Sequence, residues 1–397
     1  MRALIERLLA GEAVVAGVMS GTSADGIDVA LTRFEPSRRG RLGGVRPLVF
    51  RTLAFDAALA RRVRRVLDGE PTDLRACAPL SRDLGRAFGR AARELAEAEG
   101  FEIELVGSHG QTVWHHDGVG EGGPASLQLG DGDFVCEAAR CACVSDFRQR
   151  DMACGGEGAP IAALADDLLF ADLPRPAAVL NLGGISNLTL LSAPGAEPVS
   201  FDVGPAGALL DGLARRLLGR PFDRGGERAA RGSADPRLRG ELLRHPFLER
   251  APPKSTGRDT FGEAWVDQVV ERARALGVLA PGGEPNDLLA TAADFVARCV
   301  SDALERHAPL NLKWLVACGG GAHHAPVLDA LASSSPAPLA RGDDFGVPVD
   351  AREALAFAVL AARCILGEPV TSPSATGAAP GRTLGKISPA AIESSAP

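Results

Sequence analysis

The chain has 397 residues, longer than a single hydrophobic core usually grows, so two domains are expected. A composition of 46% hydrophobic and 23% charged residues excludes a disordered or fibrous chain. The formal net charge of −7 excludes broad electrostatic binding to nucleic acid or to anionic membranes. Glycine is abundant, at 47 residues, and its clusters mark places where the backbone turns tightly or approaches a ligand closely.

The ends and the cysteines of the chain indicate a cytoplasmic protein. Glu6 and Arg7 interrupt the apolar N-terminal run, which disqualifies it as the core of a signal peptide. The longest apolar stretch, 354–366, is too short to span a bilayer and contains Arg363. The eight cysteines include no CxxC pair and most lie in apolar runs, so we expect structural free thiols.

A strand, a tip of small and polar residues and a second strand occur twice in the chain. The first copy spans 14–31 with its tip at 20–26, and the second spans 177–191 with glycines at 183–184. The two copies lie about 160 residues apart, as expected for an internal duplication of a domain.

The first tip has the composition of an anion site. Its backbone N–H groups and the hydroxyls of Ser20, Thr22 and Ser23 are donors that suit a phosphate. Asp25 and Asp28 stand where a divalent cation bridging phosphates can be held, directly or through water. The alternative is a tight polar hairpin turned at Asp25 and Gly26.

Amphipathic helical segments alternate with the strands, which predicts an α/β fold. These segments are 59–67, 77–95, 209–217, 261–276 and 288–307. We expect a domain break near 145. The predicted domains are 1–145, possibly completed by 368–397, and 146–367.

A third glycine cluster, Gly319, Gly320 and Gly321, follows the apolar run 314–317 and precedes a helix. Such a turn lets a flat ligand or a phosphate lie against the backbone, although close helix–strand packing also requires glycine. The chain contains neither a GxxxxGK[ST] motif nor a GxGxxG motif that opens a helix. A P-loop or Rossmann site is therefore disfavoured.

Polar residues at 108–115 end a predicted strand, where His109 and Gln111 suit sugar hydroxyls or an amide. No GxSxG elbow accompanies this histidine, which disfavours a catalytic triad. The histidine pairs at 115–116 and 323–324 lack the i,i+4 spacing of a helical zinc site.

Three further clusters can bind anions or supply a base. Arg148 lies among carboxylates in 146–151 and can clamp a carboxylate or phosphate, or form a surface salt-bridge cluster. Asp202 is expected to end a short strand, which is where catalytic bases tend to sit in α/β domains. Lys254 and Arg258 flank two hydroxyl residues before a helix, which suits an anionic ligand.

These motifs, taken together, resemble the anhydro-N-acetylmuramic acid kinase family of the actin, hexokinase and Hsp70 superfamily. The resemblance covers nearly the whole chain, and so many motifs in order make chance implausible. They are GVMSGTSADGID, GSHGQTVWH, LQLGDG, DFRQRD, GGEGAP, LNLGGISNLT, FDVGPAGALLD, KSTGRDTF, CGGGAHH, EALAFA and the tail TGA…TLG.

The resemblance implies two RNase H-like domains with an ATP cleft between them. It implies a kinase that opens a 1,6-anhydro sugar with water at C1 and transfers the γ-phosphoryl group of MgATP to O6. In that reaction Asp202 is the general base that deprotonates the water. ATP and Mg²⁺ are the implied cofactors, and Asp25 contacts the magnesium through water.

The resemblance also assigns the binding residues. Nucleotide contacts fall on Ser20, Gly21, Thr22, Ser23, Asp25, Gly26, Asp28, Gly183, Gly184, Lys254, Gly319, Gly320, Gly321 and Glu353. Contacts to the sugar and its lactyl group fall on His109, Gln111, Arg148 and Asp151. The expected partners are the sugar and ATP, with no nucleic acid or membrane, and a homodimer is left open.

The chain departs from the family pattern at several positions. Ala24 replaces a usual leucine, Glu157 a usual glutamine, and Ala206 and Gly207 a usual glycine and asparagine. Losing the asparagine side chain near Asp202 affects sugar selectivity or turnover rather than the fold. Two alternatives therefore remain: a kinase for another N-acetylated amino sugar without ring opening, and an ATP-binding sensor with weakened catalysis.

Overall fold

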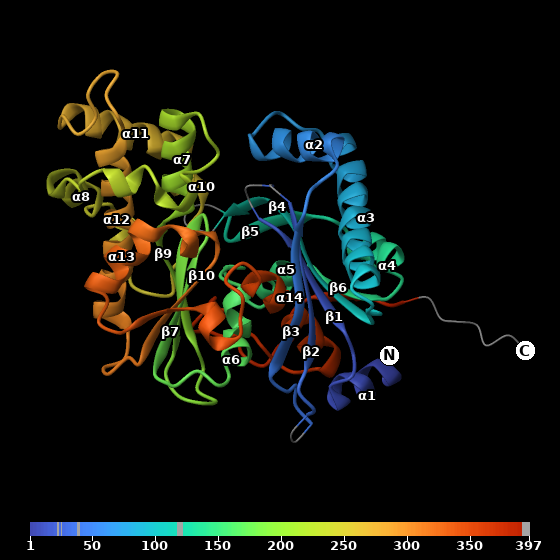
Figure 1. Ribbon diagram of the computed structural model, residues 1–397. Coiled ribbons are helices and arrows are strands. Elements are labelled where there is room, and N and C mark those ends of the chain that lie inside the picture. Colours follow the sequence, from blue (N-terminus) through green and yellow to red (C-terminus); the bar gives the residue numbers. More distant parts are fainter. Residues whose placement is uncertain (22–23, 25, 38–39, 117–121, 391–397) are drawn as a thin grey trace, which may run out of the picture. The chain divides into compact units, whose positions relative to one another are not determined.

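The computed structural model describes residues 1–21, 24, 26–37, 40–116 and 122–390 (Figure 1). Contacts divide the chain into two compact units, Met1–Ala171 with Ala351–Pro397, and Asp172–Asp350. The first unit thus extends beyond the predicted break near 145. The reason is helix α14 (Arg352–Leu366), which packs on β1 and β4 and whose Arg352 pairs with the buried carboxylate of Asp166.

The first unit is built on a mixed sheet in the order β12-β6-β4-β1-β2-β3, with β5 paired to β4. Strands β1, β2 and β3 are antiparallel neighbours, and β4 and β6 continue the sheet in parallel. The strands are β1 (Val15–Ser20), β2 (Ile27–Phe34), β3 (Val45–Leu53), β4 (Leu105–His116), β5 (Ala125–Leu129), β6 (Ala142–Ser145) and β12 (Lys386–Ser388).

Helices cover both faces of this sheet. Side chains alternate along a strand, so Val14, Ala16 and Val18 face the core shared with α3, whereas Gly17 faces α14. A Cβ at Gly17 would lie 1.8 Å from the carbonyl oxygen of Ala354, so only glycine permits this close approach. The helices of this unit are α1 (Arg2–Ala10), α2 (Ala57–Leu67), α3 (Leu74–Ala98), α4 (Gly132–Ala139), α5 (Phe147–Met152), η1 (Ala162–Ala165), α6 (Asp166–Leu169) and α14.

The second unit has a five-stranded sheet in the order β11-β10-β7-β8-β9. Its strands are β7 (Ala177–Leu182), β8 (Ile185–Leu191), β9 (Val199–Pro205), β10 (Trp314–Cys318) and β11 (Leu339–Arg341). Its helices are α7 (Gly207–Leu218), η2 (Arg224–Gly226), η3 (Ala229–Arg231), α8 (Pro236–Leu242), α9 (Pro246–Glu249), α10 (Arg258–Phe261), α11 (Glu263–Ala275), α12 (Asn286–His307), η4 (Gly320–His323), α13 (Ala325–Ser334) and η5 (Gly342–Phe345). The apolar residues of this sheet and of α7, α11 and α12 form one core.

The two sheets share one topology. In each unit the first three strands form an antiparallel meander. The first of them pairs in parallel with β4 or β10, which in turn pairs in parallel with β6 or β11, giving the orders β3-β2-β1-β4-β6 and β9-β8-β7-β10-β11. This is the RNase H-like order, and its repetition confirms the predicted α/β fold and its internal duplication. The two predicted hairpins correspond to β1–β2 and β7–β8.

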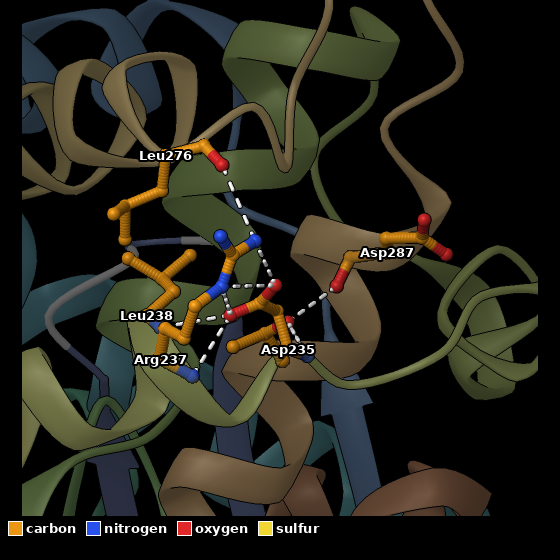
Figure 2. Close-up of polar contacts among 6 residues, drawn as sticks. Asp235, Arg237, Leu238, Leu276 and Asp287 are labelled. Atoms are coloured by element: carbon orange, nitrogen blue, oxygen red, sulfur yellow. Dashed lines mark hydrogen bonds and ion pairs between the residues drawn. The ribbon is translucent and has the colours of Figure 1, made fainter.

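Helix α8 illustrates how a short helix is fixed within the second unit (Figure 2). The Asp235 carboxylate accepts the backbone N–H groups of Arg237 at 2.8 Å and Leu238 at 3.0 Å. The Arg237 guanidinium contacts the same carboxylate and the carbonyl oxygen of Leu276. The backbone N–H of Asp235 donates to Thr291 on α12, so this cap also joins the two helices.

Among the described residues, each helix is either too short or too polar to span a bilayer. All eight cysteines are also among the described residues and are free thiols, as predicted. Burial raises the pKa of Cys141 to about 12, consistent with an inert structural thiol.

Candidate active site

Two polar side chains hold the tip of the first hairpin, one from the tip and one from strand β4. Ser20 is buried, and its hydroxyl donates to the carbonyl oxygen of Gly26 at 2.9 Å. Gln111 on β4 donates from Nε2 to the carbonyl oxygen of Gly21 at 3.1 Å. The Ser20 hydroxyl, predicted to face a phosphate, therefore supports the turn. The predicted contacts Thr22, Ser23 and Asp25 lie outside the described residues.

Asp28, predicted to act at the same tip, lies on β2 opposite Thr52 of β3. Its Oδ1 accepts a hydrogen bond from the Thr52 hydroxyl at 2.6 Å. Gly26 packs against the same strand, where a Cβ would lie 2.7 Å from Cγ2 of Thr52. Strand β3 therefore fixes the end of the tip that leads into β2.

The tip of the second hairpin is bound to the start of helix α7. The carbonyl oxygen of Gly183 accepts the N–H of Gly207, and that of Gly184 accepts those of Ala206 and Ala208, each at 2.9 Å. A Cβ at Gly207 would lie 3.1 Å from the Gly183 oxygen, so a side chain there would crowd the tip. The glycine that replaces the usual asparagine at position 207 therefore lies where the hairpin tip and helix α7 pack closely.

In the third glycine cluster, two glycines are required for close packing and one leaves its backbone open to a ligand. Gly319 has φ +82°, and a Cβ there would lie 2.7 Å from the Asn181 side chain. A Cβ at Gly321 would lie 2.6 Å from Cβ of Leu182, so both glycines are required for packing. A Cβ at Gly320 would meet no atom within 4 Å. Among the three, Gly320 presents the open backbone that a flat ligand needs.

Asp202 lies within β9 rather than at its end, which corrects the predicted position. Strand β9 runs to Pro205, and helix α7 begins only at Gly207. The prediction assumed that Asp202 lies at the carboxyl end of a parallel strand. Strand β9 is instead an antiparallel strand at the edge of the sheet. Its neighbour in the register is Asn187, beside the glycine tip of β7 and β8. The sheet therefore brings Asp202 close to that tip.

The segment 254–256 runs along β9 and fixes Asp202. The backbone N–H of Asp202 donates to the carbonyl oxygen of Lys254 at 3.0 Å. Its Oδ2 accepts the backbone N–H of Thr256 at 2.9 Å, and the residue is only 6% exposed. The buried Thr256 hydroxyl has no hydrogen-bond partner among the described residues. A buried carboxylate of fixed orientation beside such a hydroxyl is suited to bind and deprotonate a small molecule.

Lys254, predicted to face phosphates, directs its ammonium into the second unit. The side chain is 3% exposed, and Nζ donates to the carbonyl oxygen of Phe247 at 3.3 Å. Nζ also lies 4.6 Å from the centroid of the Phe247 ring. Burial, followed by the charge of Arg306, lowers the pKa of Lys254 to about 8. The side chain of Arg258 lies outside the description.

In the first unit, His109 and Arg148 meet directly. Strand β4 runs to His116, so the polar residues 108–115 form its final part, as predicted. Its pairing with β6 stops at Ser108, and pairing with β5 begins at Gln111. Arg148 donates from Nε to Nε2 of His109 at 3.0 Å, and the other ring nitrogen lies 3.1 Å from the carbonyl oxygen of Gly110. Burial, followed by the Arg148 charge, lowers the pKa of His109 well below its ordinary value, so the imidazole is neutral.

Asp151 organises the neighbouring glycine-rich loop. It is fully buried, and its two oxygens accept the Thr376 hydroxyl at 2.8 Å and the N–H of Gly158 at 2.9 Å. Burial raises the pKa of Asp151, although both hydrogen bonds favour the anion. Arg148 donates to the carbonyl oxygen of the same Gly158 at 2.6 Å. Three of the predicted sugar contacts, His109, Arg148 and Asp151, are therefore brought together.

Two contributions were missed from the sequence. Thr376 was noted only within a tail motif, and its partnership with Asp151 joins residues 225 positions apart. Arg352 precedes the predicted Glu353 in the first turn of α14, and its bidentate pair with Asp166 is buried. This pair fixes the helix start that carries the half-buried Glu353. No local pattern could identify either pairing.

The duplicated RNase H-like fold and its glycine-rich hairpin tips define a protein of the ATP-using actin, hexokinase and Hsp70 class. A family model described as anhydro-N-acetylmuramic acid kinase matches residues 13–390. The chain belongs to the anhydro-N-acetylmuramic acid kinase family, as the resemblance predicted. It is therefore a kinase, an enzyme that transfers a phosphoryl group from ATP to a small molecule.

Relatives that bear the name anhydro-N-acetylmuramic acid kinase match over nearly their full length. The protein of Gloeobacter violaceus is 38% identical over 94% of this chain and 98% of its own. That of Streptomyces coelicolor is 40% identical over 94% of this chain and 93% of its own. These matches agree with the family model in both extent and name.

Among solved structures, component A of the (R)-2-hydroxyglutaryl-CoA dehydratase of Acidaminococcus fermentans matches with a TM-score of 0.42 and 14% identity, covering 89% of this chain and 98% of its own. A ROK family glucokinase from Streptomyces griseus, in complex with glucose and AMPPNP, matches with a TM-score of 0.39 and 14% identity, covering 88% and 99%.

Proposed function

We propose that this chain opens 1,6-anhydro-N-acetylmuramic acid with water and phosphorylates its O6, giving N-acetylmuramic acid 6-phosphate for peptidoglycan recycling in the cytoplasm. Membership of the kinase family supports the activity. The observation in the site that carries the proposal is the buried Asp202 carboxylate, fixed by the N–H of Thr256. A base held in one orientation meets the first requirement of general-base catalysis.

In the proposed reaction Asp202 takes a proton from the water that attacks C1. The C1–O6 bond breaks as the C1–OH bond forms, and O6 attacks the γ-phosphorus of ATP while ADP leaves. An inverting glycosidase needs an acid to protonate its leaving oxygen. Here the phosphoryl group takes the place of that proton, so one carboxylate suffices.

We assign the nucleotide phosphates to the backbone of the glycine-rich tips, at Gly21 and at 183–184, and the adenosine to Gly320. The open space at Gly320 supports the second assignment. Backbone N–H groups suit an acidic protein that has only three lysines, because they bind anions without side-chain charge. Magnesium enters with the nucleotide as part of the substrate, with Asp25 its proposed contact through water.

We assign the carboxylate of the substrate's lactyl group to Arg148. The neutral His109 accepts a hydrogen bond from Nε, and the Gly158 carbonyl accepts one from another nitrogen of the same guanidinium. These two contacts fix the plane of the guanidinium, which suits recognition of a carboxylate. Asp151 then acts indirectly, since its two oxygens hold the Gly158 loop and Thr376.

The test is incubation with MgATP and 1,6-anhydro-N-acetylmuramic acid in ¹⁸O-labelled water, followed by mass spectrometry and NMR of the product. We expect a 6-phosphate with one ¹⁸O at C1. A phosphorylated sugar with its anhydro bridge intact, or turnover only of other N-acetylated amino sugars, favours the kinase without ring opening. Nucleotide binding with no product from any amino sugar favours the sensor.

A further inference from the structure

We propose that Lys254 is a positioning residue that fixes the segment hydrogen-bonded to the base Asp202, rather than a ligand of the nucleotide phosphates. The inference rests on the proposed role of Asp202 as the base. It concerns a residue whose position in the sequence, just before two hydroxyl residues and Arg258, suggested contact with an anionic ligand.

The first step is the backbone of Lys254. Its carbonyl oxygen accepts the N–H of Asp202, and the N–H of Thr256, two residues later, donates to the Asp202 carboxylate. Main chain and side chain of Asp202 are thus held by one three-residue segment. A displacement of this segment moves the carboxylate, and errors of 1 Å in placing catalytic groups are costly.

The second step is the side chain of Lys254, which anchors that segment. Its ammonium reaches the Phe247 carbonyl oxygen at the short helix α9 and lies 4.6 Å from the ring centroid of the same residue. Ammonium–carbonyl and cation–π contacts are both strengthened where water is excluded. The side chain thereby ties segment 254–256 to α9, and the backbone of the same segment is hydrogen-bonded to Asp202.

The third step is the surroundings of the ammonium. It borders a small cavity of about 10 Å³, which leaves no room for a phosphate. The cavity is lined by Leu248 and by Cys299, Asp302, Arg306 and His307 of α12. The Arg306 guanidinium is itself engaged, donating to the Leu248 carbonyl oxygen at 3.0 Å and lying 3.9 Å from the Asp302 carboxylate.

The charges that act on Lys254 come from three directions. Arg306 and Arg250 lower the pKa of its ammonium, while Asp202 raises it, and burial is the largest cause of the lowered pKa. The buried thiol of Cys299 has a raised pKa and is uncharged. Burial, together with Lys254 and Arg306, also lowers the pKa of His307, so that ring is neutral near pH 7. The positive charge of Lys254 interacts with the Asp202 carboxylate. This interaction favours the ionised form of the carboxylate, which is the form that a general base requires.

The first experiment uses the wild-type protein. Because the chain has only three lysines, [ε-¹³C]lysine labelling gives three side-chain signals, and Lys254 is assigned by the loss of one signal in Lys254→Met. We expect this signal to titrate near pH 8, and its midpoint to remain unchanged when AMPPNP is added. A midpoint that rises by one pH unit or more with AMPPNP overturns the proposal, because it indicates direct contact with phosphate.

The second experiment compares Lys254→Met with Lys313→Met, which removes an exposed lysine of the same unit. We expect Lys254→Met to lower kcat at least tenfold while the Kd for AMPPNP stays within about twofold of wild type. The acidic limb of its kcat–pH profile should move to higher pH, since a positive charge near Asp202 is lost. Lys313→Met should change none of these quantities.

Other outcomes are decisive as well. A tenfold weaker Kd for AMPPNP with unchanged kcat identifies a phosphate ligand, and a lowered Tm with unchanged kcat and pH profile identifies a purely structural lysine. Both overturn the proposal. If Asp202 is not the base, Asp202→Asn retains wild-type turnover. This result identifies an error in the proposed function independently of the behaviour of Lys254→Met.

Discussion

At the scale of single residues, Asp202 carries the sharpest prediction. Asparagine keeps an oxygen that can accept the Thr256 N–H but cannot take a proton from water. We expect Asp202→Asn to lower kcat by about 10² or more and to leave ATP affinity near that of wild type. Steady-state kinetics and calorimetric titration with AMPPNP provide the measurements. Asp267→Asn, at an exposed carboxylate on α11, is the matched control, and near-normal turnover in Asp202→Asn removes this residue from the role of base.

The glycines 320 and 321 are adjacent, yet they should respond differently to the same substitution. At Gly321 an added Cβ meets Leu182, so Gly321→Ala should destabilise the fold by about 1–3 kcal/mol, as overpacking does. At Gly320 the space is open, so Gly320→Ala should leave stability unchanged while weakening nucleotide binding. Urea unfolding and AMPPNP titration separate the two effects. Equal nucleotide affinity in Gly320→Ala and wild type contradicts the adenosine assignment.

At the scale of elements, the cap of helix α8 gives stability a pH dependence (Figure 2). The Arg237 guanidinium, followed by the backbone N–H of Leu238, lowers the pKa of Asp235 to about 2. Because this value lies below the ordinary 3.8, the ionised carboxylate stabilises the folded state. That contribution is complete above the ordinary value and is lost as the pH falls through about 2.

The prediction for this cap compares two variants. Asp235→Ala should lower Tm at pH 7 more than Asp235→Asn, since asparagine still caps a helix. In both variants the loss of stability between pH 4 and pH 2 should be smaller than in wild type. Differential scanning calorimetry over that range is the measurement, and identical pH profiles in all three proteins contradict the assigned pKa.

Helix α14 depends on glycines in the strands beneath it. A Cβ at Gly107 of β4 would lie 2.1 Å from the carbonyl oxygen of Phe357, a backbone atom that cannot move aside cheaply. We expect Gly107→Ala to destabilise the protein by about 3 kcal/mol or more, measured by urea unfolding. Gly240→Ala in α8 is the control: its Cβ meets open space, so it should stabilise by about 0.5–1 kcal/mol. A Gly107→Ala variant as stable as wild type refutes this packing argument.

At the scale of the whole molecule, one unit is formed by a single continuous segment of the chain and the other by two separate segments. Residues 172–350 form one uninterrupted unit with its own core, whereas the first unit is built from two separate segments. We expect the excised segment 172–350 to unfold cooperatively by circular dichroism and to give dispersed amide NMR signals. The excised segment 1–171 should do neither, because it lacks α14. Cooperative unfolding of 1–171 alone contradicts this view of the first unit.

Much of this arrangement is predictable from local patterns, because strands and hairpin tips are encoded by neighbouring residues. The two hairpins, β1–β2 and β7–β8, and the long helices near 77–95 and 288–307 were predicted correctly for that reason. The tip of the second hairpin is shorter than predicted, because Ile185 already begins β8 and only Gly183 and Gly184 separate the strands. The position of Asp202 within β9 was not, since it depends on the pairing of β9 with β8.

The buried direction of the Lys254 ammonium and the Thr376–Asp151 bond also escaped prediction. The first depends on where α9 and α12 pack, and the second on a contact across 225 residues. A sequence motif indicates which residue types a site uses. Which of them face a ligand and which hold the others in place is decided by tertiary packing.

The split construction of the first unit has a consequence for biosynthesis. Strands β1 and β4 leave the ribosome early, but α14, which covers their glycine-lined face, is made only after residue 350. At roughly 5–20 residues per second, the intervening 172–350 segment takes about 10–40 s to translate. During that interval the nascent sheet has one face uncovered, and the second unit has its complete chain before the first unit does. Chaperone capture of nascent chains should therefore peak before α14 emerges.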